Sequence, residues 1–350
     1  MTAILFLLVL AVLIFVHELG HFLVARACGI RVDEFALGFG TKLWSMKRGE
    51  TVYTLRLIPF GGYVKIFGEN PDEDSMNGSD KSRSLVNKPK WQQVLVLVAG
   101  VSFNFIFAWI LIASAFMMGV PASTDSYPQY ADRMKDTNII IGYVEAGSPA
   151  DKVGFKAGDT ITGFTTVENV QKAIAESKDK GIIINGKTIV AKEGIVEGKY
   201  AIGISMDKVA TLRLPIHLAI YEGMRFTVHI IKSTATGIYD MVAGIFKGTS
   251  RLSSVTGPIG IAGLVGDAAH LGFAYLLMFT ALISVNLGVL NLVPFPALDG
   301  GRIFFVIIES IIRRPIKPVI ANTVNTVGFG LLILLMIVVT YKDIAKLFVK

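Results

Sequence analysis

Residues 3–25 read AILFLLVLAVLIFVHELGHFLVA, an apolar run in which Glu18 is the single charged side chain. A helix that crosses a bilayer needs about 20 mostly apolar residues, so this run is long enough to span a membrane. We expect the segment to be retained, because no basic region precedes it and no small-residue cleavage site follows it. The sequence therefore predicts a first membrane span that carries His17, Glu18 and His21.

Three further stretches lack charged residues, at 91–124, 268–298 and 318–341. They predict membrane spans near 94–119, 273–294 and 323–341. The alternative is buried helices of a soluble protein, in which uncharged runs of this length are rare. The composition has 52% apolar and 17% charged residues, against about 25% charged in typical soluble domains. It excludes a disordered chain, and the single cysteine, Cys28, excludes a disulfide scaffold.

The positive charge behind the net +7 gathers in two loops, residues 25–90 and residues 302–317. Short loops rich in lysine and arginine face the cytoplasm, so we expect both loops inside and residues 120–270 outside. Lys342 and Lys346 fall on the outer side of this topology, but the two basic loops outweigh them. Because topology accounts for the charge, we expect no nucleic-acid partner.

The segments between the spans predict β structure and a separate domain. Residues 51–57 and 61–66 show the alternation and glycine boundaries that are typical of strands. A soluble α+β domain is predicted at 138–215, with strands at 138–144, near 182–190 and at 200–206, a short helix opened by Ser148 and Pro149, and a helix at 167–178. Residues 219–250 are amphipathic and lie either in the membrane interface or in water as a connecting helix.

These elements predict a domain order along the chain. It is 1–27 (first span), 28–90 (β loop and polar segment), 91–120 (second span), 121–217 (separate domain), 218–267 (amphipathic linker), 268–301 (third span) and 302–350 (loop and fourth span).

His17-Glu18-Leu19-Gly20-His21 has the HExxH pattern inside a span, where ionisable side chains are costly and indicate function. Positions i and i+4 lie on one helix face, so both imidazoles can reach one Zn²⁺ ion. Glu18 lies one step round the helix and can take a proton from water, whose pKa zinc lowers to about 7. The alternative, two interfacial histidines with a snorkelling glutamate, leaves three polar groups in one apolar span without a common reason.

A catalytic zinc needs a third protein ligand, and Asp299 is the other carboxylate beside an apolar span. It belongs to NLVPFPALDGG, residues 291–301, where two prolines break the helix and two glycines let the backbone turn. A broken helix at membrane depth is tolerated where it lines a cavity or packs on protein. Asp299 and His21 both fall on the cytoplasmic side of the predicted topology, so we expect them to meet. Alternatively, Asp299 caps a following helix at 302–312.

Together these motifs resemble the site-2 protease family of intramembrane zinc metalloproteases, in the bacterial branch that includes the regulator of sigma E protease. In order and spacing they cover nearly the whole chain. The matching pieces are His17 to His21, Gly38-Phe39-Gly40, Pro59-Phe60-Gly61-Gly62-Tyr63-Val64, Gly100 to Asn104 and Asn291 to Gly301.

The resemblance implies a polytopic α-helical membrane protein with four transmembrane helices, a membrane-reentrant β element within residues 31–68 and one extracytoplasmic PDZ-like α+β domain. The PDZ-like motifs are Gly147 to Ala150 and Gly158 to Ile161. Residues 163–200 depart from the usual PDZ pattern, so the domain either binds peptide or filters substrates by size.

The resemblance also implies a site. His17, His21 and Asp299 are the expected ligands of one zinc ion per chain, with Glu18 as general base. Asn291 is expected to act in catalysis by holding or polarising the substrate. The residues expected to contact substrate are Gly61, Gly62, Tyr63, Val64, Asn104, Pro294 and Pro296, with a packing role as the alternative for Asn104.

The implied function is cleavage of transmembrane segments in the bacterial cytoplasmic membrane, with the active site toward the cytoplasm. The expected substrates are membrane proteins with a single transmembrane helix, such as anti-sigma factors or remnant signal peptides, first trimmed by an extracytoplasmic protease. The alternatives are a membrane zinc transporter and a non-proteolytic zinc-binding scaffold. Glu18 favours the protease, because a transport site has no need of a base beside two histidines.

Overall fold

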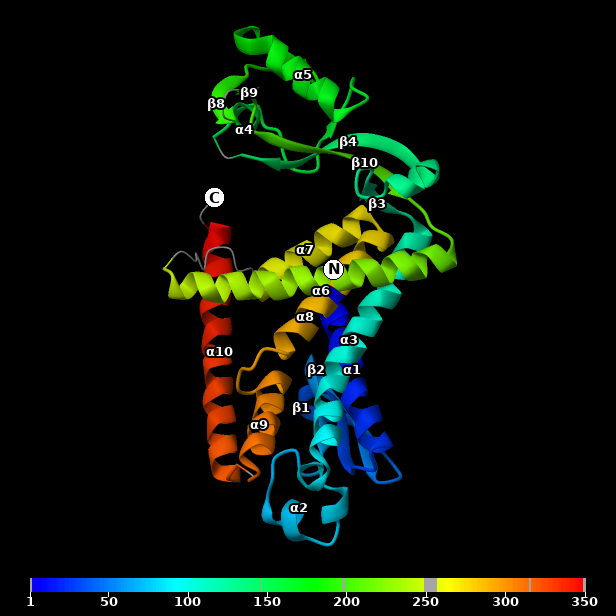
Figure 1. Cartoon of the computed structure of the whole chain (residues 1–350), viewed down its shortest axis with the longest axis vertical. Helices are drawn as coiled ribbons and strands as arrows, with labels where there is room; N and C mark the ends of the chain where they lie inside the picture. Colours follow the sequence, from blue (N-terminus) through cyan, green and yellow to red (C-terminus); the bar gives the residue numbers. More distant parts are fainter. Residues whose placement is uncertain (1, 146, 197–198, 249–256, 315, 349–350) are drawn as a thin grey trace. The chain divides into compact units, whose positions relative to one another are not determined.

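The computed structural model describes residues 2–145, 147–196, 199–248, 257–314 and 316–348 (Figure 1). The chain forms two compact units. Unit 1 combines Met1–Ser114 with Ala219–Lys350, and unit 2 is Ala115–Leu218. The separate domain that the sequence predicts at 121–217 lies within unit 2.

Among the described residues four helices are long and apolar enough to cross a membrane, and they coincide with the four predicted spans. They are α1 (Thr2–Ala27), α3 (Lys90–Met118), α8 (Phe273–Asn291) and α10 (Pro318–Phe348). The third ends before the predicted residue 294, because a helical conformation is disfavoured next to Pro294. The fourth starts before the predicted residue 323, since proline is well accommodated at a first helical position. The protein is therefore a membrane protein.

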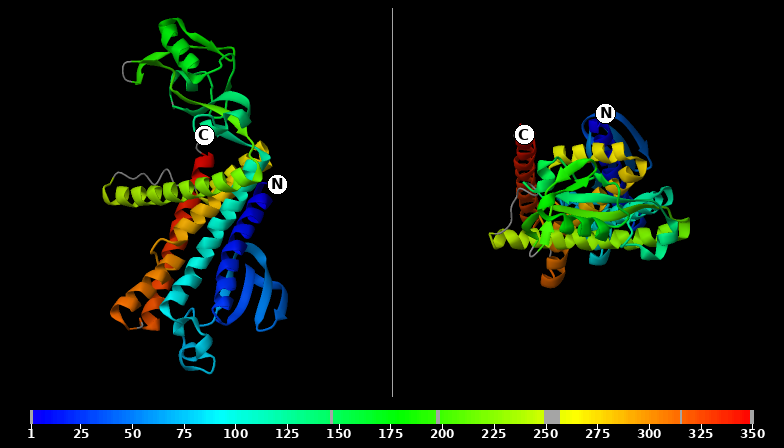
Figure 2. Two further views of the ribbon diagram at one scale, coloured as in Figure 1. Left: turned by 45° about the vertical axis from the view of Figure 1, so that its right-hand side comes forward. Right: turned by 90° about the horizontal axis from the view of Figure 1, so that it is seen from above.

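A β-sheet lies beside α1 in unit 1 (Figure 2). Strands β1 (Val32–Arg48) and β2 (Thr51–Ile66) are antiparallel, and both bend. As a result residues 34–37 pair on both sides; Phe35, for example, faces Val64 on one side and Tyr53 on the other. Residues 61–66 form one edge of this sheet, and among the described residues no strand pairs with their outer side. The predicted strands 51–57 and 61–66 are thus two halves of β2, whereas β1 was not predicted.

The sheet is held to the helices by a shared apolar core. This core contains Phe22 of α1, Phe35 of β1, Val64 of β2 and Val96 of α3. Leu85 adds the polar segment that follows β2. That segment forms α2 (Glu73–Asn77) and two short 3-10 helices, η1 (Lys81–Arg83) and η2 (Leu85–Asn87).

Three further helices complete unit 1: α6 (Ile216–Phe246), α7 (Pro258–Leu271) and α9 (Asp299–Ile312). Helix α6 lies across the direction of α3 and α10 (Figure 1). It is fixed by Trp109 Nε1, which donates to Ile220 O, and by Thr234 Oγ1, which donates to Asn286 Oδ1 of α8. Its position across the spans fits the amphipathic helix that the sequence predicts at 219–250; residues 249–250 lie outside the described residues.

Unit 2 has a four-stranded sheet of order β3-β10-β4-β5. Its elements are β3 (Val120–Ser123), η3 (Pro128–Arg133), β4 (Met134–Val144), α4 (Pro149–Lys152), β5 (Thr160–Ile161), α5 (Val167–Ser177), η4 (Lys178–Lys180), the hairpins β6 (Ile182–Ile184)–β7 (Lys187–Ile189) and β8 (Lys192–Val196)–β9 (Lys199–Ala201), and β10 (Ile204–Leu212). Ser148 caps α4 through the Asp151 N–H, as its place before Pro149 predicts. Ile141, Ile174 and Ile189 lie in the core of the unit, so unit 2 has a hydrophobic core of its own.

Candidate metal centre

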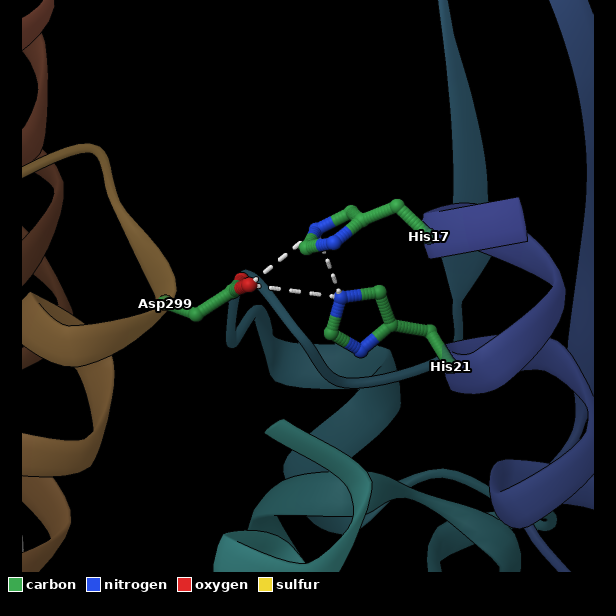
Figure 3. Close-up of side chains that lie close together, drawn as sticks. All are labelled: His17, His21 and Asp299. Atoms are coloured by element: carbon green, nitrogen blue, oxygen red, sulfur yellow. Dashed lines mark hydrogen bonds and ion pairs between the residues drawn. The ribbon is translucent and has the colours of Figure 1, made fainter. Parts of the chain in front are cut away.

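The two histidines of the HExxH motif converge because four residues on a helix make about one turn. His17 and His21 are both buried on α1, and their Nε2 atoms lie 3.2 Å apart. Asp299 reaches the same point from α9 (Figure 3). Its Oδ2 atom lies 3.2 Å from His17 Nε2 and 3.4 Å from His21 Nε2. The predicted ligand set therefore meets in space, although the chain separates its ends by more than 270 residues.

Asp299 is delivered by a tightly folded loop between α8 and α9. A Cβ atom on Gly300 would overlap the carbonyl oxygens of Leu292 and Val293, so the loop needs glycine there. Ala297 adopts positive φ, and its N–H donates to Asn325 Oδ1 of α10. Asp299 is the first residue of α9, and the capping position, Leu298, makes no side-chain hydrogen bond. The Asp299 side chain points at the histidines, which is not the arrangement that a helix cap requires (Figure 3).

The three atoms that face one another can all act as acceptors when both imidazoles are neutral with the proton on Nδ1, which is the chemistry of a cation site. His21 Nδ1 lies 2.8 Å from Val96 O; a carbonyl can only accept, so Nδ1 carries the proton and Nε2 keeps a lone pair. Asp299 Oδ2 is buried and has no hydrogen-bond partner. A tetrahedral zinc site holds nitrogen and oxygen ligands roughly 3.3 Å apart. The observed separations of 3.2, 3.2 and 3.4 Å fit zinc.

Asn104 of α3 lies behind His17 and is completely buried. Its Nδ2 is 3.2 Å from His17 Nδ1, and its Oδ1 has no partner. Turning the amide by 180° pairs that oxygen with a proton on His17 Nδ1, which frees the Nε2 lone pair for a metal. A second partner of this kind orients a metal-binding histidine. The geometry therefore places Asn104 against a ligand, on the side of the ring away from the metal.

Two glycines let α1 and α3 approach closely enough to build the site. A Cβ on Gly20 would lie 2.5 Å from Ala99 O, and a Cβ on Gly100 would overlap His21 Nε2. Small residues allow such backbone approach between membrane helices. Gly100 belongs to the glycine–asparagine motif, but the sequence did not reveal that its empty side-chain position holds the imidazole rings. Glycine four residues before a buried asparagine was the available signal.

A cavity of about 310 Å³ opens at the ligands. It is lined by His17, Glu18, His21, Tyr63, Val64, Lys65, Ile66, Glu69, Asn70, Asp299 and Arg302. Tyr63 and Val64 bring the edge of the sheet to the metal centre, where the sequence expected substrate contact. Arg302, which the sequence did not indicate, lies three residues after Asp299 and thus on the same helix face. It pairs with Glu69 of the segment after β2.

The other expected site residues lie at different distances from the ligands. Asn291 Nδ2 is 3.5 Å from His17 Nε2, so the end of α8 meets the centre. A Cβ on Gly62 would lie 3.7 Å from Glu18 Cγ, which puts the edge strand beside the predicted base. Gly61 is at the bend against Phe39, and Pro296 packs on Gly328 of α10. Pro294 is exposed in the α8–α9 loop. The structure thus does not bring Gly61, Pro294 or Pro296 into the cavity lining.

The chain is similar to known proteins over nearly its whole length. The chain matches the model of peptidase family M50 over residues 5–335. A protein of Clostridium perfringens, provisionally named a zinc metalloprotease, is 38% identical over 97% of both chains. One of Clostridium acetobutylicum with the same provisional name is 36% identical over 97% of this chain and 96% of its own. The regulator of sigma-W protease RasP of Bacillus subtilis is 30% identical over 99% of each chain.

Proposed function

Because the chain belongs to peptidase family M50 and is a zinc metalloprotease, we propose that it cleaves transmembrane segments of other membrane proteins inside the bilayer. One observation carries the proposal. His17, His21 and Asp299 meet beside a cavity that Glu18 lines, and α1, which holds three of these four residues, is long and apolar enough to span a membrane.

The chemistry follows from the groups at the cavity. Zinc, when held by His17, His21 and Asp299, supplies a Lewis acid that polarises the scissile carbonyl and acidifies water. Glu18 takes the proton of the attacking water and returns it to the amine that leaves. Asn291, at the same centre, donates an amide N–H toward the oxygen on which negative charge develops. Asn104 and Val96 hold the two imidazoles in orientation.

A substrate helix must be extended before a peptide bond in it can be attacked, and the sheet edge at residues 61–66 suits the extended form. An exposed edge strand can bind a peptide by main-chain hydrogen bonds. We propose that this sheet is the membrane-reentrant element. Its far end supports this, because Leu43, Trp44 and Leu57 are exposed apolar side chains there.

For unit 2 we propose a PDZ-like domain outside the cytoplasm. It is supported by a groove of about 500 Å³ between α5 and the β9–β10 segment, lined by Ile174, Ile204 and Met206 among others. In the part of unit 2 that the structure describes, β3 pairs with β10 only from Val209 onward, so residues 204–207 have no strand partner on that side, beside this groove. An Ile204→Arg substitution should abolish binding of a fluorescent decapeptide with an apolar C-terminus. Unchanged binding, or none to the parent protein, would favour a size filter instead.

The proposed setting is the bacterial cytoplasmic membrane, with the metal centre toward the cytoplasm. The basic loops at 25–90 and 302–317 support this orientation. The proposed substrates have a single transmembrane helix, as anti-sigma factors and remnant signal peptides do, and are trimmed first by an extracytoplasmic protease. The relationship to a regulator of sigma-W protease supports the anti-sigma type.

Two substitutions in the purified protein test the proposal. Glu18→Gln should keep zinc but lower cleavage of a model membrane substrate by about 10²–10⁴-fold, the usual contribution of a general base. Asp299→Ala should lower the zinc content measured by mass spectrometry, because it removes one of three ligands. Undiminished cleavage by Glu18→Gln contradicts the mechanism, and full zinc content in Asp299→Ala removes that residue from the ligand set.

A further inference from the structure

In this sheet, the carboxylate of Glu34 on β1 is hydrogen-bonded to side chains from both halves of β2. Glu34 of β1 accepts hydrogen bonds from Thr54 Oγ1 at 2.8 Å, Arg56 Nη2 at 3.0 Å and the Tyr63 hydroxyl at 2.8 Å. Arg56 also donates to the Tyr63 oxygen at 2.7 Å and to Gly40 O at 3.0 Å. We call Glu34, Arg56 and Tyr63 the sheet triad.

The sheet triad is shielded from water, so its interactions are stronger than those of an exposed pair. The side chains of Glu34 and Arg56 are 16% and 18% exposed. Burial raises the pKa of Glu34, but the hydrogen bonds from Thr54, Tyr63 and Arg56 outweigh it and lower the pKa below its ordinary value. The carboxylate is therefore ionised at neutral pH.

Tyr63 connects the sheet triad to the candidate metal centre. Tyr63 belongs to the edge strand 61–66 and lines the cavity at the metal ligands. The neighbouring Gly62 lies beside Glu18. Residues 34–37 of β1, which include Glu34, lie between the edge strand and the first half of β2, which carries Arg56. The Tyr63 phenol reaches across these residues of β1. The edge strand is therefore held by the Tyr63 side chain in addition to its backbone hydrogen bonds.

We propose that the Glu34–Arg56 pair is a positioning device that acts through Tyr63, fixing the edge strand relative to the metal centre and so setting the register in which an extended substrate segment is held. The inference rests on the proposed function, in which this edge binds substrate. Strand register matters here because a shift of one residue turns every side chain to the other face, and a shift of two moves the next equivalent bond to the catalytic groups.

The test uses two variants that leave no unpaired buried charge. Tyr63→Phe removes one hydroxyl, and the double variant Glu34→Leu with Arg56→Leu removes both charges together. In the full-length protein, with a model transmembrane substrate, KM should rise about tenfold, as expected for lost hydrogen bonds to charged groups. The kcat value should change by less than about threefold, and mass spectrometry of the products should show cuts at two or more positions spaced by two residues.

Zinc content provides a readout that does not depend on turnover, and it should stay at one ion per chain in both variants. The matched control is Arg83→Met, which breaks the exposed Arg83–Glu50 pair near the same sheet and should leave KM and the cut site unchanged. A single unchanged cut site with unchanged KM in Tyr63→Phe overturns the positioning role while the protease assignment stands. If the zinc-loaded parent protein cuts no membrane substrate, the proposed function itself fails.

Discussion

Glycine has different roles at the candidate metal centre of unit 1 and at three turns of unit 2. In unit 1, a Cβ on Gly20 would run into the opposite helix, and a Cβ on Gly100 would run into the His21 imidazole. In unit 2, Gly147, Gly158 and Gly186 have positive φ and no atom within 4 Å of a Cβ built there. The first kind of glycine is needed for close approach, whereas the second is needed for backbone conformation.

This difference indicates which substitutions each unit tolerates. In unit 1 the metal centre depends on interhelical distance, so a single methyl group can displace a ligand. In unit 2 the apolar core holds the fold, and a methyl added at Gly147, Gly158 or Gly186 meets only the strain of a left-handed backbone. Four substitutions separate these two kinds of sensitivity.

The largest effect is expected for Gly100→Ala. The new methyl would overlap His21 Nε2, so the zinc content should fall close to zero while the helix content measured by circular dichroism is retained. Gly237→Ala in α6 is the control, because its Cβ meets no atom within 4 Å. If Gly100→Ala binds one zinc ion per chain, α1 and α3 can move apart without loss of the metal centre. That result would contradict the proposed difference between the two kinds of glycine.

Ile141→Ala should destabilise unit 2 and spare the metal centre. Ile141 is 1% exposed, and truncating a buried isoleucine to alanine costs about 2–5 kcal/mol. Hydrogen exchange in β4 and β10 should accelerate, with zinc content unchanged. The control is Ile183→Ala, whose side chain is 68% exposed. Loss of zinc together with faster exchange would mean that the two units do not keep separate stability.

Asn104→Leu should weaken zinc binding without abolishing it. Removing the partner of a metal-binding histidine typically costs about 10–100-fold in metal affinity. Competition with a chelator gives the affinity. Ser102→Ala is the control, since Ser102 Oγ bonds only to Val98 O within the same helix. Equal affinity in the two variants would reduce Asn104 to helix packing.

Gly158→Ala should produce the smallest change. Its backbone has φ +95°, a conformation that costs an alanine about 1–2 kcal/mol, and space is available for the methyl. Hydrogen exchange of unit 2 should report this modest loss, with no change in zinc. Gly142→Ala, at ordinary φ and with its nearest neighbour at 3.9 Å, should be close to neutral. A larger effect at Gly142 than at Gly158 would reverse the conformational explanation.

Much of the candidate site could be predicted from the sequence, because each pattern that indicates it lies within a short stretch of the chain. His17, Glu18 and His21 share one helix turn, and the prolines and glycines around Asp299 announce a break at the end of a span. The sequence did not predict three other features in this way: the role of Gly100, the contact between Asn104 and His17, and Arg302 as a lining residue. Each of them depends on which face of one helix meets which face of another.

The sheet shows the same limit in β structure. Alternation and glycine boundaries predicted the two halves of β2, because each half follows a local period of two. They did not predict that residues 34–37 pair on both sides, which makes 61–66 an edge and brings Glu34 within hydrogen-bond distance of Tyr63 and Arg56. Pairing is a property of two strands together, so neither strand alone encodes it.

By itself the sequence determined that four segments are long and apolar enough to span a membrane, and it predicted the zinc ligands and the general base. Hydropathy and helical spacing act over a few residues, and so they can be read along the chain. Only the tertiary structure decided that His21 lies against Val96, His17 against Asn104 and Asp299 between both histidines. These contacts join residues 75 or more positions apart, and close packing between α1, α3 and the α8–α9 loop creates them.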